Sequence, residues 1–153
     1  MGGNEWSMSR GLVVLEPDEK LEDLIDTAIT FANGSSGELV LLHITEEGSD
    51  ADDRDEMRAL TGSDSSYRPG LDGAESFAAD VGEQFVGNAV PYHSTAAMGE
   101  PVGRIEATVD EFDCDHVFVL GRRRSPTGKA IFGDTTQALL LESAVPVTIM
   151  MRD

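Results

Sequence analysis

The sequence predicts an α/β fold in which a parallel β-sheet is covered on both faces by helices. Short apolar runs alternate along the chain with segments whose apolar residues recur at spacings of three and four, the period of an amphipathic helix. The runs are continuous rather than alternating, as expected for strands buried on both faces. A helix that joins two such strands also requires the strands to be parallel.

The first apolar run, residues 11–16 (GLVVLE), predicts a buried strand that ends on an acid. From Pro17 onward, apolar residues recur at helical spacing, and acids crowd the first turns, where the helix dipole favours negative charge. Residues 33–37 (NGSSG) end this helix. Residues 38–45 (ELVLLHIT) predict the second strand, and we expect His43 to make a local hydrogen bond in the core rather than to bind a ligand.

Residues 46–69 form an acidic insert with few apolar residues. We expect it to lie in solvent at the carboxyl edge of the sheet, with a helical piece around residues 54–60. Clustered carboxylates suit Ca²⁺, but the spacing lacks the glycine and the closing glutamate of an EF-hand loop. We therefore do not expect a specific metal site here.

The second half of the chain continues the alternation of helices and strands. Helical spacing returns over residues 71–86, and Pro91 marks residues 89–97 as an edge strand. The remaining elements, in order, are a turn over residues 98–101, a helix from Val102 to Phe112, a buried strand over 116–120, a basic loop over 121–133, a helix over 135–143 with apolar Ala138, Leu139 and Leu141, and a last strand from Val145 to Met151. We expect Cys114, the only cysteine, to be a buried thiol.

The composition is strongly acidic, with 29 Asp and Glu against 11 Lys and Arg and a formal net charge of −18. Such a surface repels nucleic acid and anionic membranes, so we expect neither as a partner. Two explanations compete, a basic protein partner and adaptation to molar salt, which screens like charges. The acids lie along the whole chain and lysine is almost absent, a pattern that resembles halophile proteins. We favour salt adaptation, which says nothing about function.

The length is typical of one domain, and we expect residues 1–153 to form one, with residues 1–10 as a flexible leader. No apolar run approaches the roughly 18 residues that a membrane helix needs. The first ten residues lack the apolar core of a signal peptide. We therefore expect a cytoplasmic protein.

Five segments resemble, in order and spacing, the universal stress protein family over residues 11–151. They are the turn Glu16-Pro17-Asp18-Glu19, the second strand 39–44 (LVLLHI), the turn Gly99-Glu100-Pro101, the segment Val119-Leu120-Gly121 followed later by Gly133, and the closing strand 146–150 (PVTIM). The resemblance implies a five-stranded parallel sheet of order 3-2-1-4-5, of the Rossmann-like type that binds adenine nucleotides. It also implies a stress-linked regulatory role with an unidentified protein partner, and a homodimer formed through the last strand.

Family members that bind ATP, with or without Mg²⁺, use the loop after the fourth strand. Glycines in this loop let backbone N–H groups approach the phosphates, and the last glycine precedes a Ser or Thr that opens a helix. The acid after the first strand holds the ribose, and the residue near the end of the second strand meets the adenine. Carried onto this chain, the resemblance implies the nucleotide-binding residues Glu16, Ile44, Leu120, Gly121, Arg122, Arg124, Gly133, Asp134 and Thr135.

The chain departs from this pattern in four places. Glu16 replaces an Asp, Arg124 replaces the second glycine, Asp134 replaces the Ser or Thr, and the outer glycines are one position closer together. A carboxylate at a helix start makes a good N-cap but repels phosphates. Thr135 can supply the missing hydroxyl if the loop shifts by one residue.

Four cations lie close together in the same loop, at Arg122, Arg123, Arg124 and Lys129. Guanidinium groups hold phosphates bidentately, so the cluster suits an anion clamp that replaces the glycines. A hub of internal salt bridges with nearby acids explains the cluster equally well. A P-loop does not, because its first glycine and its Mg²⁺-binding Ser or Thr are both missing around Lys129.

Three function classes remain. They are a nucleotide-binding regulatory module, a dimeric interaction protein without nucleotide, and a slow ATP hydrolase. The sequence shows no nucleophile–base pair, so we assign no catalytic residue and expect at most weak hydrolysis. Rival folds fit less well, because a receiver domain needs a Lys after its last strand and a flavodoxin needs a Ser/Thr-rich loop after its first.

Overall fold

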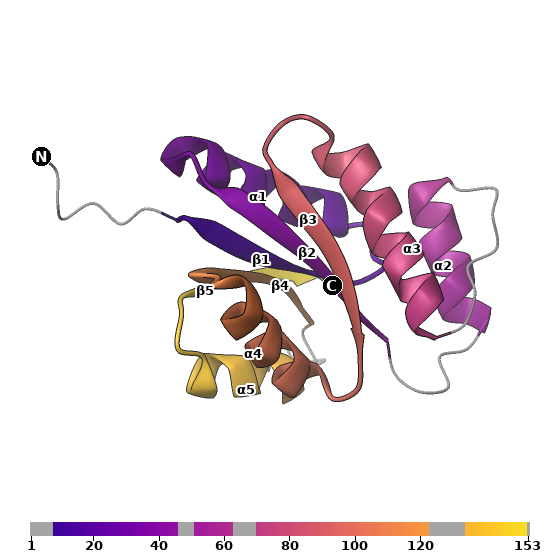
Figure 1. The fold of residues 1–153 in the computed structure, drawn as a ribbon. Helices are drawn as coiled ribbons and strands as arrows, with labels where there is room; N and C mark the ends of the chain where they lie inside the picture. Colours follow the sequence, from indigo (N-terminus) through magenta and orange to yellow (C-terminus); the bar gives the residue numbers. More distant parts are fainter. Residues whose placement is uncertain (1–7, 46–50, 63–69, 123–133, 153) are drawn as a thin grey trace, which may run out of the picture.

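One parallel sheet organises the computed structural model, which describes residues 8–45, 51–62, 70–122 and 134–152. The strand order is β3-β2-β1-β4-β5, which confirms the predicted fold class (Figure 1). The strands are β1 (Arg10–Leu15), β2 (Glu38–Thr45), β3 (Tyr92–Met98), β4 (His116–Arg122) and β5 (Val147–Arg152). The helices are α1 (Leu21–Ser35), α2 (Ala51–Thr61), α3 (Leu71–Val81), a π-helical turn η1 (Gly82–Val86), α4 (Pro101–Phe112) and α5 (Asp134–Glu142).

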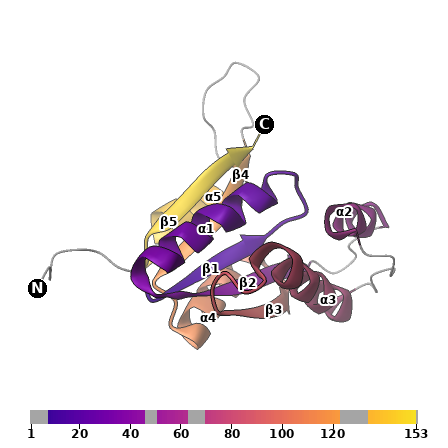
Figure 2. The ribbon, with the colours of Figure 1, turned by 90° about the horizontal axis from the view of Figure 1, so that it is seen from above.

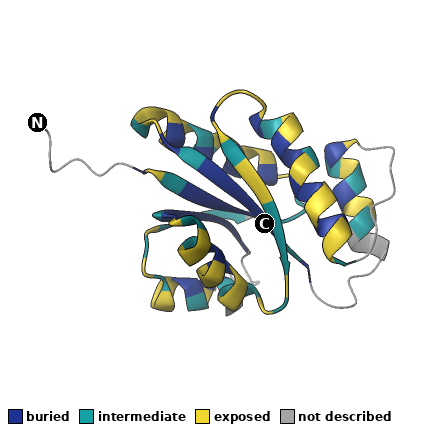
Figure 3. Cartoon of the chain, in the orientation of Figure 1, coloured by how far each residue is buried: buried dark blue, intermediate teal, exposed yellow. Residues whose placement is uncertain are grey.

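The sheet separates two apolar cores. Helices α1 and α3 lie on one face and α4 and α5 on the other (Figures 1 and 2). Alternation along β1 supplies both cores, because Val13 and Leu15 pack with α1 and α3 whereas Leu12 and Val14 pack with α4. The inner strands are buried, and the edge strands β3 and β5 are partly exposed (Figure 3).

Helix α1 begins at Leu21, the first residue of its apolar pattern, and not at Pro17, where we expected the helix to open. The segment from Pro17 to Lys20 forms turns instead, because the Lys20 amide donates to the Asp18 carboxylate (2.8 Å) and the Leu21 amide to the Asp18 carbonyl (3.0 Å). Aspartate competes in this way with the first helical turn. The helix ends within the predicted segment, at Ser35, and its C-cap residue Ser36 has a left-handed φ of 55°.

Part of the acidic insert packs against the domain. Met57 of α2 is only 6% exposed and joins the core beneath α1 and α3. Gln84 of η1 donates a hydrogen bond to the Thr61 carbonyl at the end of α2. The prediction of a fully solvated insert is therefore wrong for α2, and residues 46–50 and 63–69 lie outside the described residues. Over the described ranges, no group of three acidic, His or Cys side chains could hold a metal ion.

The predicted helix over residues 71–86 is present, but its last turn is a π turn. The Gly87 amide donates to the Gly82 carbonyl (2.8 Å), five residues back. Any side chain at Gly82 would clash with the ring of Tyr92 at the start of β3. Glycine therefore lets the end of this helix lie directly against β3.

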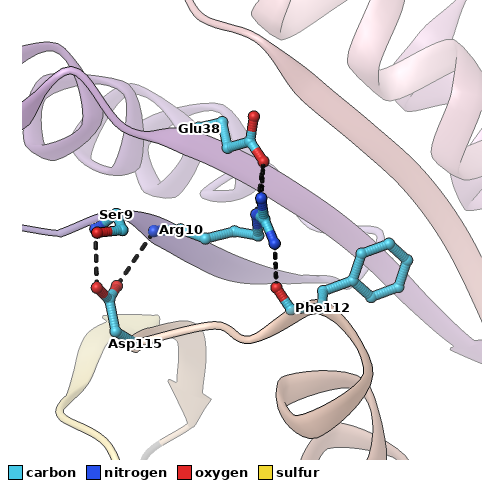
Figure 4. A network of polar contacts seen from close by, with 5 residues as sticks. All are labelled: Ser9, Arg10, Glu38, Phe112 and Asp115. Carbon is cyan, nitrogen blue, oxygen red and sulfur yellow. Dashed lines mark hydrogen bonds and ion pairs between the residues drawn. The ribbon is translucent and has the colours of Figure 1, made fainter.

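A polar cluster ties the amino edge of the sheet together (Figure 4). Arg10 contacts the Glu38 carboxylate at 2.5 Å and donates to the Phe112 carbonyl at the end of α4. The backbone amides of Ser9 and Arg10 donate to the Asp115 carboxylate at 2.8 and 3.2 Å. We call these five residues the amino-edge clamp. Because the clamp includes residues 9 and 10, and Met8 is 1% exposed, residues 8–10 are part of the fold and not of the flexible leader expected over residues 1–10; residues 1–7 lie outside the described residues.

Two further titratable side chains are buried near this edge. Cys114 is 5% exposed, as expected, and burial raises the pKa of its thiol to about 11. His116 of β4 stacks on Phe118, and its Nε2 lies 2.6 Å from the Thr148 hydroxyl of β5. Burial lowers the pKa of His116, and the nearby Asp115 carboxylate partly offsets this shift.

Several boundaries in the C-terminal half differ from the prediction. Strand β4 continues through Gly121 and Arg122, which we expected in the loop, because both residues pair with β5. Leu141 of α5 is 79% exposed and does not belong to the apolar face, since Thr136 and Leu139 turn toward the sheet instead. Strands β3 and β5 each begin two or three residues later than predicted. The described part of the chain contains no helix long and apolar enough to cross a membrane.

Candidate functional site

The carboxyl edge of the sheet contains the switch point of this topology. The chain runs from β1 to β2 and β3 on one side, whereas β4 and β5 lie on the other. Connections that leave β1 and β4 in opposite directions open a crevice where ligands bind in such sheets. Glu16 follows β1 directly and is half-buried, and Gly121 lies at the corresponding end of β4. The structure thus brings these two predicted residues to the same edge.

Ile44 lies next to this point, near the end of β2. Its half-buried side chain packs in the core covered by α4 and α5, together with Ala97, its neighbour in β3. It therefore provides an apolar surface at the carboxyl edge, on the α4 face of the sheet. The contact to an adenine base that the family resemblance implies for Ile44 stays a prediction.

Leu120 has the core role expected of the buried strand, and Gly121 has a structural role that the sequence did not reveal. The Leu120 side chain is 4% exposed and packs in the opposite core with α1, so only its backbone can face a ligand on the α4 side. A Cβ added at Gly121 would lie 2.7 Å from Ile149 Cγ2 and 2.9 Å from Met151 Sδ. Close packing of β5 against β4 therefore requires glycine at position 121, whether or not a phosphate binds there.

The start of α5 lies beyond the loop that follows β4. Asp134 is the first helical residue and Thr135, the second, is half-buried. The first backbone N–H groups of a helix lack intrahelical partners and favour an anion. Arg122 is the last residue of β4, opposite Arg152 of β5. Arg124 and Gly133, like Arg123 and Lys129, lie outside the described residues, so the anion clamp and the salt-bridge hub both stay predictions.

A second corner, between β3 and α4, adjoins the end of β2. The Gly99 amide donates to the Thr45 carbonyl (3.1 Å), and the φ of Gly99 is 132°, a conformation that favours glycine. Glu100 then caps α4, because its carboxylate accepts from the amides of Val102 (3.0 Å) and Gly103 (2.7 Å). The turn predicted over residues 98–101 is therefore confirmed, and it brings the start of α4 beside the end of β2.

Arg104 lies over this corner and was missed by the sequence analysis. Its Nε would be 3.3 Å from a Cβ built on Gly99. The side chain is exposed, and no carboxylate of the described residues lies within ion-pair distance. The sequence signal that could have identified Arg104 is a cation in the first turns of the helix that follows the predicted glycine turn.

Comparisons with known proteins agree on one family. The model of the Universal stress protein family matches residues 8–150. Universal stress protein UspA from Lactobacillus plantarum has a similar structure, with a TM-score of 0.66 and 16% identity over 95% of this chain and 99% of that chain. The chain matches no curated protein.

Two further similar structures contain an adenine nucleotide. One is a universal stress protein in complex with cAMP, with a TM-score of 0.60 and 15% identity over 97% of this chain and all (100%) of that chain. The other is the universal stress protein from Archaeoglobus fulgidus in complex with dAMP, with a TM-score of 0.55 and 16% identity over 93% of this chain and 96% of that chain.

Proposed function

Because the chain belongs to the universal stress protein family, we propose that it is a regulatory module that binds an adenine nucleotide at the carboxyl edge of its sheet. The observation that carries the proposal is the convergence of Glu16, Ile44 and Gly121 on the switch point, where the connection to α5 also leaves the sheet. Two similar structures contain cAMP and dAMP, which supports adenine as the base. We take ATP as the first ligand to test.

The residues present fit the nucleoside half of such a ligand. The Glu16 carboxylate accepts hydrogen bonds from two ribose hydroxyls, and its longer side chain replaces the Asp of the family pattern. Ile44 provides an apolar surface for the base. The described residues therefore fit the ribose and the base of the ligand better than they fit its phosphates.

The phosphate half has supporting and opposing groups. The first N–H groups of α5, the Thr135 hydroxyl and the guanidinium groups of Arg122 and Arg124 favour phosphates. The carboxylate of Asp134 opposes them, and Mg²⁺ bound with ATP would reduce this repulsion. Arg122→Ala with Arg124→Ala should weaken ATP binding more than tenfold, whereas Asp134→Ser should tighten it.

The deciding experiment uses protein purified in molar KCl without added nucleotide. The folded protein is denatured, the supernatant is analysed for adenine nucleotides by chromatography, and ATP is titrated by calorimetry in the same salt. We expect about one nucleotide per chain in one of these two measurements. Folded protein that neither carries nor binds any adenine nucleotide would refute the proposal.

A matched pair of variants tests the ribose contact. Glu16→Gln should lose affinity for ATP and most of its preference for ATP over 2′-deoxy-ATP, since the amide cannot accept two hydroxyl donors as well as a carboxylate. Glu22→Gln removes the same charge from an exposed position in α1 and should leave both affinities unchanged.

The second candidate function is a dimeric interaction protein, and the exposed edge strand β5 favours it. Its residues from Val147 to Met151 are half-exposed, and α5 adds Leu140 and Leu141, which are 49% and 79% exposed. Residues 135–151 contain one acid, Glu142, although the whole chain has 29. We propose that residues 1–153 form one domain that dimerises through the last strand, because this surface minimises repulsion between two acidic copies.

Light scattering after size exclusion tests the dimer. Wild-type protein should elute with the mass of two chains in molar KCl, and Ile149→Lys should elute as a monomer. A dimer that persists with Lys at position 149 would contradict an interface through β5. A folded dimer that binds no nucleotide would favour the interaction protein over the binding module.

A further inference from the structure

We propose that Arg104 is a base-contacting residue, whose guanidinium group packs on the face of the adenine ring and closes the end of the site formed by β2, β3 and α4. The inference rests on the proposed function and adds to it a residue that the family pattern does not include. It gives a role to an arginine that has no carboxylate within ion-pair distance among the residues that the structure describes.

The position of Arg104 is the first argument. Ile44, the proposed base contact, is followed by Thr45, whose carbonyl accepts a hydrogen bond from Gly99 (3.1 Å). Arg104 lies over Gly99, with Nε 3.3 Å from the place that a Cβ would take. Arg104 is therefore connected to Ile44 through Gly99 and Thr45. Both Ile44 and α4 lie on the same face of the sheet.

Glycine at position 99 makes this arrangement available. The turn needs a φ of 132°, which residues with a side chain rarely adopt. A Cβ there would also lie 3.3 Å from Arg104 Nε, which is tighter than an ordinary contact, so the guanidinium group would have to shift. Gly99 therefore both forms the corner and leaves room for the guanidinium group above it.

The electrostatics of the corner is the second argument. Glu100 is four residues before Arg104 in the first turns of α4, a spacing at which opposite charges commonly pair. Its carboxylate instead turns back to the amides of Val102 and Gly103 as the helix cap. By contrast, Arg10, Lys20 and Arg58 each contact a carboxylate. Within the described ranges, Arg104 is therefore exposed and has no ion-pair partner.

The corner favours a contact with the base over one with the phosphates. The phosphates belong near the start of α5 and the end of β4, on the other side of β1 from β3. A planar guanidinium group stacks well on an aromatic face, and such contacts contribute about 0.5–2 kcal/mol, which is roughly threefold to thirtyfold in affinity. The contact should therefore act equally on every ligand that contains adenine.

The test measures affinity for adenosine, AMP, ADP and ATP by calorimetry in molar KCl, with wild-type protein and three variants. Arg104→Ala should weaken all four ligands by the same factor, roughly threefold to thirtyfold. Arg104→Lys keeps the positive charge but lacks the planar guanidinium group, so it should recover less than half of the binding free energy that Arg104→Ala loses. Arg54→Ala removes an arginine of α2 that also lacks an ion pair among the described residues, and should change nothing.

Each outcome is decisive. A loss that grows from adenosine to ATP would show a phosphate contact and overturn the base assignment, as would full rescue by lysine. Unchanged affinities in Arg104→Ala, with wild-type binding intact, would overturn this inference and leave the proposed function standing. Absence of binding in folded wild-type protein would refute the proposed function and this inference with it. Circular dichroism of each variant confirms that it is folded.

Discussion

The amino-edge clamp should contribute measurably to stability, and Arg10→Met tests it because methionine keeps much of the apolar stem. Arg10 and Glu38 are 34% and 26% exposed, so screening reduces their ion pair to about 0.5–1 kcal/mol. The charged hydrogen bond to the Phe112 carbonyl adds about 1.5 kcal/mol. The variant should therefore lose about 2 kcal/mol of unfolding free energy, or roughly 4–8 °C in Tm.

Urea unfolding followed by circular dichroism, at one fixed KCl concentration, measures this loss. The double variant with Glu38→Gln should reveal a coupling of about 0.5–1 kcal/mol between the two side chains. Arg58→Met is the matched control, because Arg58 pairs with Asp55 on the surface of α2, where the side chains are 38% and 64% exposed, and should cost less than about 0.5 kcal/mol. Equal losses in Arg10→Met and Arg58→Met would refute the reasoning.

Three further predictions follow from burial. Leu139→Ala should cost about 2–4 kcal/mol of unfolding free energy and Leu141→Ala less than about 0.5, because the side chains are 1% and 79% exposed; similar urea midpoints for the two variants would contradict this. Burial lowers the pKa of His116 from its ordinary 6.5, so the folded state binds this proton less well than the unfolded state. Stability should fall as the pH drops below about 6.5, and thermal melts of His116→Gln from pH 7.5 to 5 should show a smaller decrease than wild type. Burial raises the pKa of Cys114 from 9.0 to about 11, so at pH 8 its modification by a disulfide reagent should be about a hundredfold slower in folded than in urea-unfolded protein, and equal rates would exclude the buried thiol. The same shift stabilises the fold below pH 9, and this contribution should be lost as the pH rises through about 11.

The order of elements was predictable because each strand and helix carries its own hydrophobic period. The β2 bounds agree at both ends, and His43 makes the expected core contact, with Nδ1 2.8 Å from the Leu15 carbonyl. The end of α1 was also readable, since glycine and serine mark it locally. The start of α1 was missed for a local reason, the turn at Asp18, whereas other errors lie where a distant partner decides the outcome, as for Gly121 and Arg122, which extend β4 because β5 lies beside them.

The site was only partly predictable for the same reason. Glu16 and Ile44 follow from strand ends, which local patterns locate. Glycine is required at position 121 because of the register of β5 against β4. The position of Arg104 depends on the conformation of the turn between β3 and α4. Neither is a property of a short window of sequence. The docking of α2 through Met57 likewise depends on a core made by residues distant in the chain.

The central position of β1 bears on how the protein is made. β1 is synthesised first, yet one of its edges pairs with β4, and Arg10 and Asp115 of the clamp are 105 positions apart. During translation the apolar face stays uncovered until α4 has been made, and that edge stays unpaired until β4 has been made. An unpaired apolar strand invites association with other chains. A product truncated before His116 should therefore aggregate rather than accumulate as a folded fragment.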